Sequence, residues 1–385
     1  MMRSDTRTPR SLAIAGAWGY IGSKFIEAGL ALGQEVYVFD PGPVPDEIDL
    51  SSVTRVESEA DFYALDVDLF HLALHPEHRS SALRLLLPRA ETETLLILDE
   101  KPMASPDSPG ECEVLIQQSA RSGVVLLFDF PELFDPITDR IFEFLDAFDD
   151  VVIDEVRIQR SKDREDRENP RNLKTMVPIQ FQESVHCLAF LLNLLARQAG
   201  SVEQALSRGL SVRASSDPYD PPNPEAYPYV VDGRCDFDMR IGDTAVIGHT
   251  DFKRNAPFRK ERLIRGRGDG QSFEILVDFL EGAKYLMIDG EDQRCEPWGS
   301  SYTAVLEGLQ RLHAGIPAGE LMTGVYPNPA FAQYTYQLSS VLWRASRDGE
   351  EIVLPDADSL RSFNARFAED VPRFPHYEGS DGPAQ

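Results

Sequence analysis

The sequence is poor in cysteine and contains no long apolar run. Its 385 residues include four cysteines, Cys112, Cys187, Cys235 and Cys295, and these lie more than 40 positions apart. Such isolated cysteines predict neither a disulfide framework nor a zinc site, and they fit a reducing cytoplasm. The longest apolar stretches, such as Leu188–Leu192, are far below the roughly 18 residues that a membrane helix requires, so no membrane partner is expected.

Positive charge is also scarce. The chain has 38 Lys and Arg against 64 Asp and Glu, which gives a formal charge of −26, and only seven of the basic residues are lysines. A field of this sign opposes a polyphosphate backbone, so nucleic acid is not expected as a partner. The acidity is assigned to solubility or to a salty cytoplasm, and no catalytic role is expected for it.

The two ends of the chain are polar and differ from its interior. Residues 1–10 are polar, and the apolar segment Ser11–Gly16 that follows has no small-residue cleavage site after a long apolar core. No signal peptide is therefore predicted, and a cytoplasmic location is expected. The last ten residues, His376–Gln385, are rich in Gly, Ser, Asp and Pro and predict a flexible tail.

The first 125 residues alternate strand-length apolar runs with helical patterns. Strands are expected at Leu12–Ala15, Glu35–Phe39, Leu69–Leu74, Leu95–Leu98 and Val124–Phe128, and helices at Ile21–Leu32, Ser80–Leu87 and Gly110–Ala120. Strands and helices that alternate at this spacing form right-handed crossovers, which predict a parallel sheet with both faces covered. A chain of this length is expected to form two domains.

After about residue 150 the pattern changes to that of an antiparallel sheet. Cys235–Ile241 and Phe273–Phe279 alternate apolar and polar residues, as half-buried strands do. Helices are expected at Ser184–Ala196, at Tyr302–Ala314 and from Asn328–Pro329 onward, whereas the proline-rich stretch Asp217–Pro228 is expected to be a loop.

The segment most informative about function lies between the first strand and the first helix. It has glycines at 16, 19 and 22, a GxxGxxG spacing in which Trp18 replaces the second glycine of the commoner GxGxxG form. Glycines at such a turn let a pyrophosphate approach the backbone, and the helix N-terminus supplies N–H donors for the phosphates. A glycine turn without a ligand is the alternative. The turn residues predicted to bind a dinucleotide are Gly16, Trp18, Gly19, Tyr20 and Ile21.

Asp40 ends the second predicted strand, 18 residues after Gly22. An acidic side chain at this distance accepts hydrogen bonds from the adenosine ribose hydroxyls and repels a 2′-phosphate. Pro41, Gly42 and Pro43 follow, and no basic residue does. The sequence therefore predicts NAD rather than NADP, with a solvated turn aspartate as the alternative.

Two polar segments follow the next predicted strands, at the sheet edge where open α/β sheets bind ligands. The first contains Leu74, His75 and His78, and the second contains Glu100 and Lys101, and all five are expected to contact the dinucleotide. His71 would lie inside a strand, and Pro76 would interrupt any helix shared by His75 and His78. The three histidines are therefore not expected to share a metal. No metal site is predicted.

These motifs together resemble the Gfo/Idh/MocA oxidoreductases, the glucose–fructose oxidoreductase and inositol dehydrogenase superfamily. The resemblance rests on the glycine turn, Asp40, the segment Ala73–His78, Glu100-Lys101-Pro102 and Phe134-Asp135-Pro136. It implies an α/β fold with a Rossmann dinucleotide-binding domain over residues 1–125. It also implies an α+β substrate-binding domain over 126–375, whose large, mostly antiparallel open sheet often mediates dimers or tetramers; residues 376–385 are the expected tail.

The resemblance also implies the reacting groups. Family members carry Asp-x-Gly-x-His at the start of a helix in the second domain, and the matching residues here are Gln182, Ser184 and His186, with Glu183 offering a carboxylate next to Gln182. His186 would act as acid and base, Lys101 would donate a hydrogen bond to the carbinol oxygen, and Gln182 would orient the substrate. The residues expected to contact substrate are Lys101, Arg171, Lys174, Gln182, Glu183 and His186.

Two functions follow from this resemblance. The first is an NAD-dependent oxidoreductase acting on a secondary alcohol or ketone of a sugar, an inositol or a sugar derivative. The second is a non-catalytic dinucleotide-binding sensor or regulator, like the galactose-pathway repressor of the superfamily. The intact Lys101 and His186 favour the enzyme, whereas Gln182 in place of the aspartate favours the regulator.

Overall fold

The computed structural model describes residues 10–46, 48–121, 123–252, 258–294 and 299–372. The predicted tail and Cys295 lie outside these residues. The chain divides into two compact units: the first comprises Met1–Phe144 and Cys295–Tyr334, and the second comprises Leu145–Arg294 and Thr335–Gln385. The sequence predicted a single boundary after residue 125, which would cut the strand Val125–Asp129 of the first unit.

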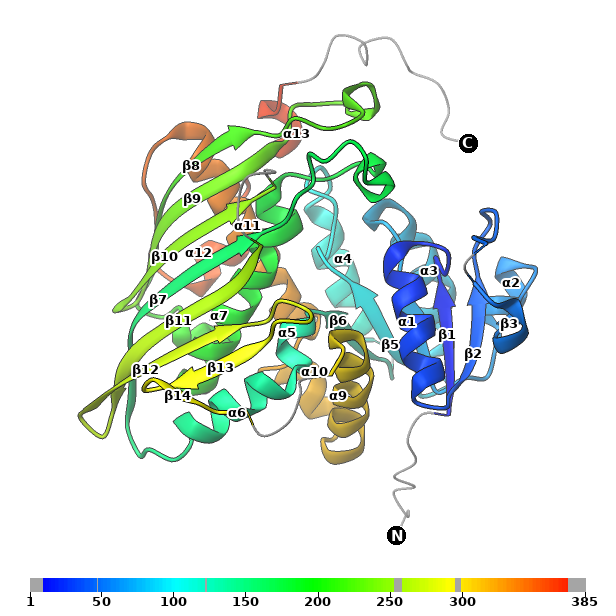
Figure 1. Ribbon diagram of the computed structural model, residues 1–385, viewed down its shortest axis with the longest axis horizontal. Helices are drawn as coiled ribbons and strands as arrows, with labels where there is room; N and C mark the ends of the chain where they lie inside the picture. The colour runs from blue at the N-terminus through cyan, green and yellow to red at the C-terminus, as the bar shows by residue number, and fades with distance from the viewer. Residues whose placement is uncertain (1–9, 47, 122, 253–257, 295–298, 373–385) are drawn as a thin grey trace. The chain divides into compact units, whose positions relative to one another are not determined.

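The first unit contains a six-stranded parallel sheet in the order β3-β2-β1-β4-β5-β6 (Figure 1). Its strands are β1 (Ser11–Ala15), β2 (Glu35–Phe39), β3 (Thr54–Arg55), β4 (Leu69–Leu72), β5 (Leu96–Glu100) and β6 (Val125–Asp129). The strands β4, β5 and β6 are buried at every position, as expected for a parallel sheet covered on both faces. This is the strand order of a dinucleotide-binding fold, and the predicted parallel sheet is confirmed.

Helices connect these strands and complete the core of the first unit. They are α1 (Tyr20–Ala31), α2 (Glu59–Tyr63), α3 (Pro76–Arg89), α4 (Gly110–Ser119) and α5 (Pro131–Phe134), with the 3₁₀ turn η1 (Leu50–Ser52). The chain returns to this unit through α9 (Ser301–Gly315) and α10 (Ala318–Thr323). Val305, Leu306 and Leu309 of α9 are fully buried in the same apolar cluster as Leu12 and Phe25, so the late segment is part of the core of the first unit.

The second unit is built on a nine-stranded sheet in the order β14-β13-β12-β11-β7-β10-β9-β8-β15. Its strands are β7 (Val151–Ser161), β8 (Leu210–Pro218), β9 (Asp232–Ile241), β10 (Thr244–Asp251), β11 (Arg259–Gly268), β12 (Gln271–Asp278), β13 (Tyr285–Ile288), β14 (Glu291–Asp292) and β15 (Ile352–Leu354). All neighbours are antiparallel except β7 and β10. The predicted α/β class with a second, mostly antiparallel sheet is confirmed.

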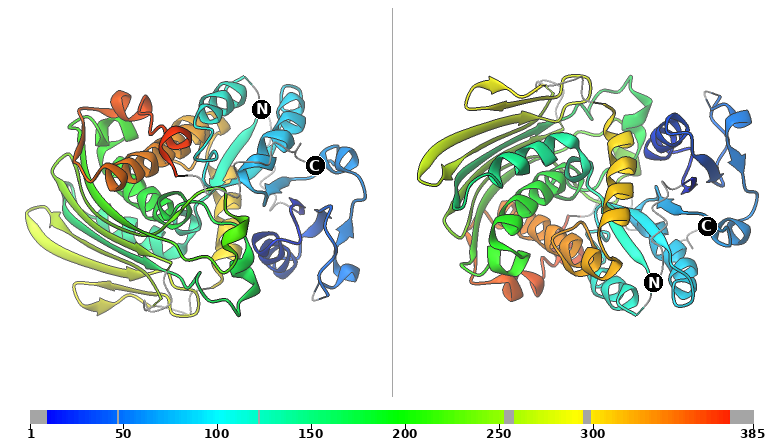
Figure 2. Two further views of the ribbon diagram at one scale, coloured as in Figure 1. Left: turned by 90° about the horizontal axis from the view of Figure 1, so that it is seen from above. Right: turned by 90° about the horizontal axis from the view of Figure 1, so that it is seen from below.

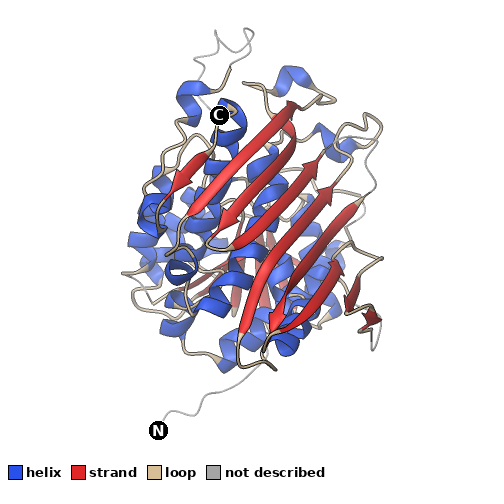
Figure 3. Ribbon diagram, turned by 90° about the vertical axis from the view of Figure 1, so that its left-hand side faces the viewer, coloured by secondary structure: helices blue, strands red, loops and turns tan. Residues whose placement is uncertain are grey.

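Helices cover one face of this sheet. The apolar helix α7 (Val185–Ala199) and the long helix α11 (Pro329–Asp348) lie on the same side of it, as the views from above and below show (Figure 2). Ser184, just before α7, is tied to the sheet by a 2.8 Å hydrogen bond to Thr250 of β10. No described helix of the second unit crosses the opposite face (Figure 3).

Short elements complete the described chain. They are α6 (Pro136–Leu145), η2 (Pro170–Leu173), the π-helical turn η3 (Gln180–Ser184), α8 (Val202–Ala205), η4 (Pro224–Ala226), α12 (Ala357–Arg361) and α13 (Phe367–Asp370). Cys112, Cys187 and Cys235 are buried. Among the described residues, no helix combines the length and apolar character that crossing a membrane requires.

Candidate functional site

The glycine turn after β1 divides into two packing positions and one open position. Gly16 has φ 74°, and a Cβ there would lie 2.4 Å from the carbonyl oxygen of Ala73. A Cβ on Gly22 would lie 2.3 Å from the carbonyl oxygen of Gly16. Gly19 is exposed, and a Cβ there would meet one atom only, the carbonyl oxygen of Gly16 at 3.3 Å. Gly16 and Gly22 therefore serve packing, whereas Gly19 leaves the backbone accessible.

The N-terminus of α1 has the properties of an anion site. Gly19 is its N-cap residue, no side chain caps the free N–H groups, and no acidic residue stands in the first turn. Unsatisfied N–H donors and the positive end of the helix dipole attract a phosphate. Of the other predicted turn residues, Tyr20 is exposed and Ile21 is half-buried.

Asp40 lies beside this turn, at the end of β2. Its carboxylate accepts hydrogen bonds from the backbone N–H of Trp18 at 3.0 Å and of Gly42 at 2.8 Å. These bonds hold a half-buried negative charge next to the glycine turn. A 2′-phosphate placed there would face that charge, whereas ribose hydroxyls could donate to it.

The segment after β4 contributes Leu74, His75 and His78. Leu74 is close to the glycine turn, because its Cδ2 would lie 3.0 Å from a Cβ on Gly16. His75 is the N-cap residue of α3 and is 43% exposed, and His78 is exposed in the first turn of that helix. The structure thus places Leu74 with the predicted dinucleotide residues, and both histidines near the surface.

A buried polar cluster lies beneath the Glu100-Lys101-Pro102 segment. His71 of β4 is fully buried, and its Nε2 is 3.2 Å from Oε1 of Glu100 at the end of β5. Asp129 ends β6 and is the register partner of Glu100. Ligand atoms of these three residues lie within 4.8 Å of one another and form the one described group that could hold a metal ion. The sequence did not predict it, because its members come from three separate strands.

The two carboxyl groups of this cluster, Glu100 and Asp129, have pKa values shifted in opposite directions. Burial and the neighbouring charge of Glu100 raise the pKa of Asp129 well above its usual value. Burial also acts to raise the pKa of Glu100, but His71, Lys101 and Arg79 together outweigh it, so that this pKa is lowered. Burial and the neighbouring charges thus oppose ionisation of Asp129 and favour ionisation of Glu100. Lys101, which is half-buried, lowers the pKa of both carboxyl groups by its charge.

Arg79 fixes the backbone from which Lys101 projects. It is 2% exposed, and its guanidinium donates hydrogen bonds to the carbonyl oxygens of Glu100 and Pro102. The same guanidinium is 3.5 Å from Asp99, whose carboxylate accepts the backbone N–H of Glu100 at 2.9 Å. These contacts define the position of Lys101 at the carboxyl edge of the sheet.

In the second unit, the predicted reacting residues lie where η3 meets α7. Gln182 is half-buried in the π-helical turn, and His186 is 7% exposed in the first turn of α7. Arg171 in η2 and Lys174 directly after it are both exposed. The described structure thus gives Arg171 and Lys174 surface positions and His186 a buried one.

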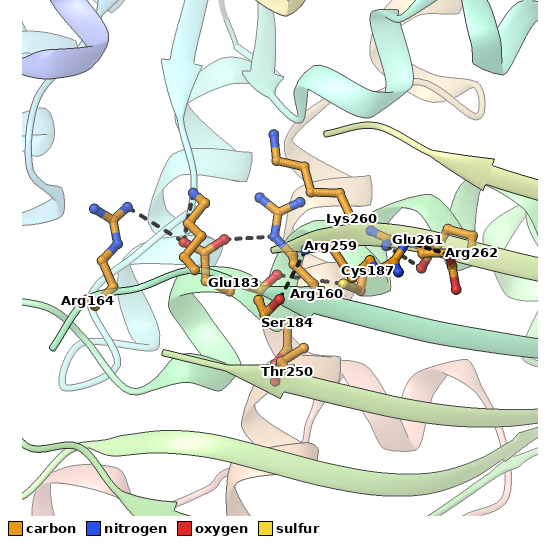
Figure 4. A network of polar contacts seen from close by, with 12 residues as sticks. Arg160, Arg164, Glu183, Ser184, Cys187, Thr250, Arg259, Lys260, Glu261 and Arg262 are labelled. Atoms are coloured by element: carbon orange, nitrogen blue, oxygen red, sulfur yellow. Dashed lines mark hydrogen bonds and ion pairs between the residues drawn. The ribbon is translucent and has the colours of Figure 1, made fainter. Parts of the chain in front are cut away.

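Glu183 has a different environment from the one predicted. It was expected to contact substrate, but it is 0% exposed and lies among cations, of which Figure 4 labels Arg160 and Arg164. Its carboxylate oxygens are 2.7 Å from Nε of Arg160, 2.9 Å from Nζ of Lys162 and 3.9 Å from a guanidinium nitrogen of Arg164. A carboxylate buried this deeply needs counter-charges, and these three cations supply them.

No protein-family model matches this sequence, and no curated protein does. Among solved structures, a myo-inositol dehydrogenase from Corynebacterium glutamicum has a TM-score of 0.63 at 13% identity, covering 91% of this chain and 100% of its own. An oxidoreductase from Agrobacterium radiobacter, in complex with NAD⁺, L-tartaric acid and magnesium, has a TM-score of 0.63 at 12% identity, covering 90% and 98%. A super-repressor mutant of Gal80p from Saccharomyces cerevisiae has a TM-score of 0.65 at 13% identity, covering 92% and 100%.

These likenesses extend over nearly the whole length of each chain. The predicted resemblance to Gfo/Idh/MocA-type oxidoreductases is thereby confirmed as a likeness of fold. At this level of identity, residue roles do not follow from the comparison, since one fold supports different functions.

Proposed function

We propose that this protein is an NAD-dependent oxidoreductase that transfers a hydride between nicotinamide and a secondary alcohol or ketone of a sugar, an inositol or a sugar derivative. The observation that carries the proposal is the open glycine turn before α1, with the carboxylate of Asp40 held beside it. This arrangement fits a dinucleotide whose phosphates meet the helix N-terminus and whose ribose hydroxyls meet Asp40.

The bound nicotinamide would supply hydride acceptance or donation, and the protein side chains manage the proton and the charge. His186 takes the hydroxyl proton during oxidation and returns it during reduction, for which an imidazole is suited near neutral pH. The ammonium of Lys101 donates a hydrogen bond to the carbinol oxygen and stabilises developing alkoxide. Gln182 orients the substrate without accepting its proton.

A second candidate function is a dinucleotide-binding regulator without catalytic activity. Two observations favour it: Gln182 stands where family members carry an aspartate, and Gal80p is among the proteins of similar fold. The oxidoreductases among these proteins favour the enzyme. A regulator would bind NADH and turn over no polyol.

We also propose that the protein forms a homodimer or homotetramer through the nine-stranded sheet, in the cytoplasm. The sheet face without a described helix supports this, because Ile247 is 44% exposed there and, with Leu263 and charged residues such as Arg157, lines a hollow of about 780 Å³. Molar mass measured by light scattering tests the assembly, and a monomeric mass contradicts it.

The cofactor assignment is tested by fluorescence. Trp18 lies in the glycine turn, so its emission should be quenched by NADH and less by NADPH. An equal or stronger response to NADPH contradicts the role given to Asp40.

The catalytic assignment is tested by Lys101→Ala and His186→Ala. Each should abolish turnover, since one acid–base group contributes about 10²–10⁴-fold, while NADH affinity stays within a few-fold of wild type. Unchanged turnover in either variant removes that residue from the mechanism. The substrate itself requires a screen of NADH formation over polyols, sugars, sugar acids and nucleotide sugars.

A further inference from the structure

Three cations lie on one face of β7 and its extension. The backbone stays paired beyond Ser161, because the N–H of Lys162 donates to Asp251 at 2.9 Å and that of Arg164 donates to Phe252 at 2.9 Å. Side chains alternate along extended chain, so positions 160, 162 and 164 share a face. Arg160 and Arg164 point toward Glu183 (Figure 4), and Nζ of Lys162 is 2.9 Å from its carboxylate.

The acidic residues of the same segment are directed toward backbone amides. Asp163 accepts the N–H of Glu165 at 3.2 Å and of Asp166 at 3.1 Å. Glu165 accepts the N–H of Asp220 at 3.2 Å, and Asp166 accepts that of Glu168 at 3.1 Å. Within the described chain, Glu183 is the only acid within ion-pair distance of Lys162 or Arg164.

One carboxylate is therefore shared by three cations, inside a chain of net charge −26. Burial lowers the pKa of Lys162, Glu183 acts to raise it, and the charges of Arg164, Arg160 and Lys260 lower it further, so that it lies well below the ordinary value. Lys260 belongs to β11 and is the register partner of Arg160, so it adds positive charge on the same face. The surroundings of Lys162 are thus short of negative charge.

The surroundings of Arg164 are also short of negative charge. Its side chain is 13% exposed, its closest described acid is Glu183 at 3.9 Å, and its buried Nε has no hydrogen-bond partner in the described chain. A guanidinium is strongly stabilised by a carboxylate or a phosphate in two-point contact. Lys162 is 33% exposed, so an anion that reaches it from solvent can also approach Arg164.

The position of this cluster connects it to the candidate substrate residues. Glu183 belongs to the same π-helical turn as Gln182 and precedes His186 by three residues. We propose that the substrate carries a carboxylate or phosphate group and that Lys162 and Arg164 bind it. This inference rests on the proposed oxidoreductase function and names the substrate class for it. Arg160, which is 3% exposed and 2.7 Å from Glu183, keeps that carboxylate neutralised.

The test compares substrates that share one carbon skeleton. D-Sorbitol is neutral, D-gluconate adds a carboxylate and D-sorbitol 6-phosphate adds a phosphate, and NADH formation or competitive inhibition is measured for each. One or both anions should bind at least tenfold more tightly than sorbitol, and the better one identifies the group. Lys162→Gln and Arg164→Gln should each remove this advantage. Arg167→Gln is the matched control, because Arg167 is an exposed cation of the same segment.

A second measurement does not depend on turnover. Inorganic phosphate or D-gluconate should raise the Tm of the wild type and of Arg167→Gln, but not that of Lys162→Gln or Arg164→Gln. A Tm close to that of the wild type, measured without added anion, shows that each variant folds. If sorbitol binds as tightly as both anions, or the variants keep the anion-dependent Tm shift, the inference is refuted. NADH binding with turnover of sorbitol would then still support the proposed function. Absence of NADH binding would instead refute the function and leave the Tm shift as the test of the anion site.

Discussion

The glycine turn provides the sharpest prediction, because two of its glycines differ in what surrounds them. In Gly22→Ala the new methyl group would lie 2.3 Å from the carbonyl oxygen of Gly16 and 2.8 Å from Cα of Ala17. Both atoms are backbone, so β1 and α1 must separate, and overpacking of this kind costs about 1–3 kcal/mol. In Gly19→Ala the methyl group has a single contact at 3.3 Å, and φ −65° with ψ 161° suits any residue.

Gly22→Ala should therefore lower the free energy of unfolding, measured by urea denaturation, by about 1–3 kcal/mol. Gly19→Ala should keep it within about 1 kcal/mol but weaken NADH at least tenfold, because the methyl group covers the helix N-terminus that would meet the phosphates. Gly110→Ala, which has no atom within 4 Å of the new methyl group, is the control and should change neither quantity. Wild-type NADH affinity in Gly19→Ala would refute the assignment of the turn to the pyrophosphate, and unchanged stability in Gly22→Ala would refute the packing argument.

Three further predictions follow from charged groups. Asp40→Asn removes the charge that faces a 2′-phosphate, so the ratio of NADH to NADPH affinity in a fluorescence titration should fall about tenfold or more; an unchanged ratio contradicts this. Glu183→Gln leaves buried Arg160 without its carboxylate and should lower the free energy of unfolding, measured by urea denaturation, by about 3–5 kcal/mol. Glu351→Gln, which removes an exposed ion pair with Arg213, should lower it by less than about 1 kcal/mol. Equal losses in the two variants would argue against a buried network. His249 has a raised pKa because Asp251 and Asp236 hold its charged form, so its contribution to stability is complete below pH 6.5 and is lost as the pH rises through the folded-state pKa. The urea midpoint of the wild type should therefore fall between pH 6 and pH 9, and His249→Asn should reduce this fall. If the variant shows the same fall as the wild type, other groups cause it.

Much of the fold was predictable because its pattern is local. The β1-turn-α1-β2 segment, the buried runs of β4, β5 and β6, and the alternation in β9 and β12 are all visible within ten residues of sequence. The strands β7 and β11 were missed because they are dense in charge, as in Arg259–Gly268. Their stabilising partners lie on other strands: Arg267 is 2.8 Å from Asp154, and Arg265 is 2.8 Å from Glu274. Cross-strand pairing of this kind cannot be read from one strand alone.

The candidate site was predictable only where a motif is contiguous. Glu100 and Lys101 could be singled out as a tripeptide with Pro102, whereas the relation of Glu100 to His71 and Asp129 depends on the strand order β4-β5-β6. The same reason applies to Glu183. Its position next to a helix-start histidine suggested substrate contact, but the sheet register brings three cations of β7 and its extension to it.

The return of the chain to the first unit has a consequence for the order of synthesis. Residues 145–294 are made before α9, yet Val305, Leu306, Leu309 and Leu321 belong to the core that includes β1 and α1. A nascent chain that ends at Phe144 lacks these side chains and leaves part of that core open to water. The first unit can therefore complete its core only after most of the second unit has left the ribosome. A fragment cut at the seam between the units would lack the same residues, so cofactor binding is a property to be measured on the whole chain.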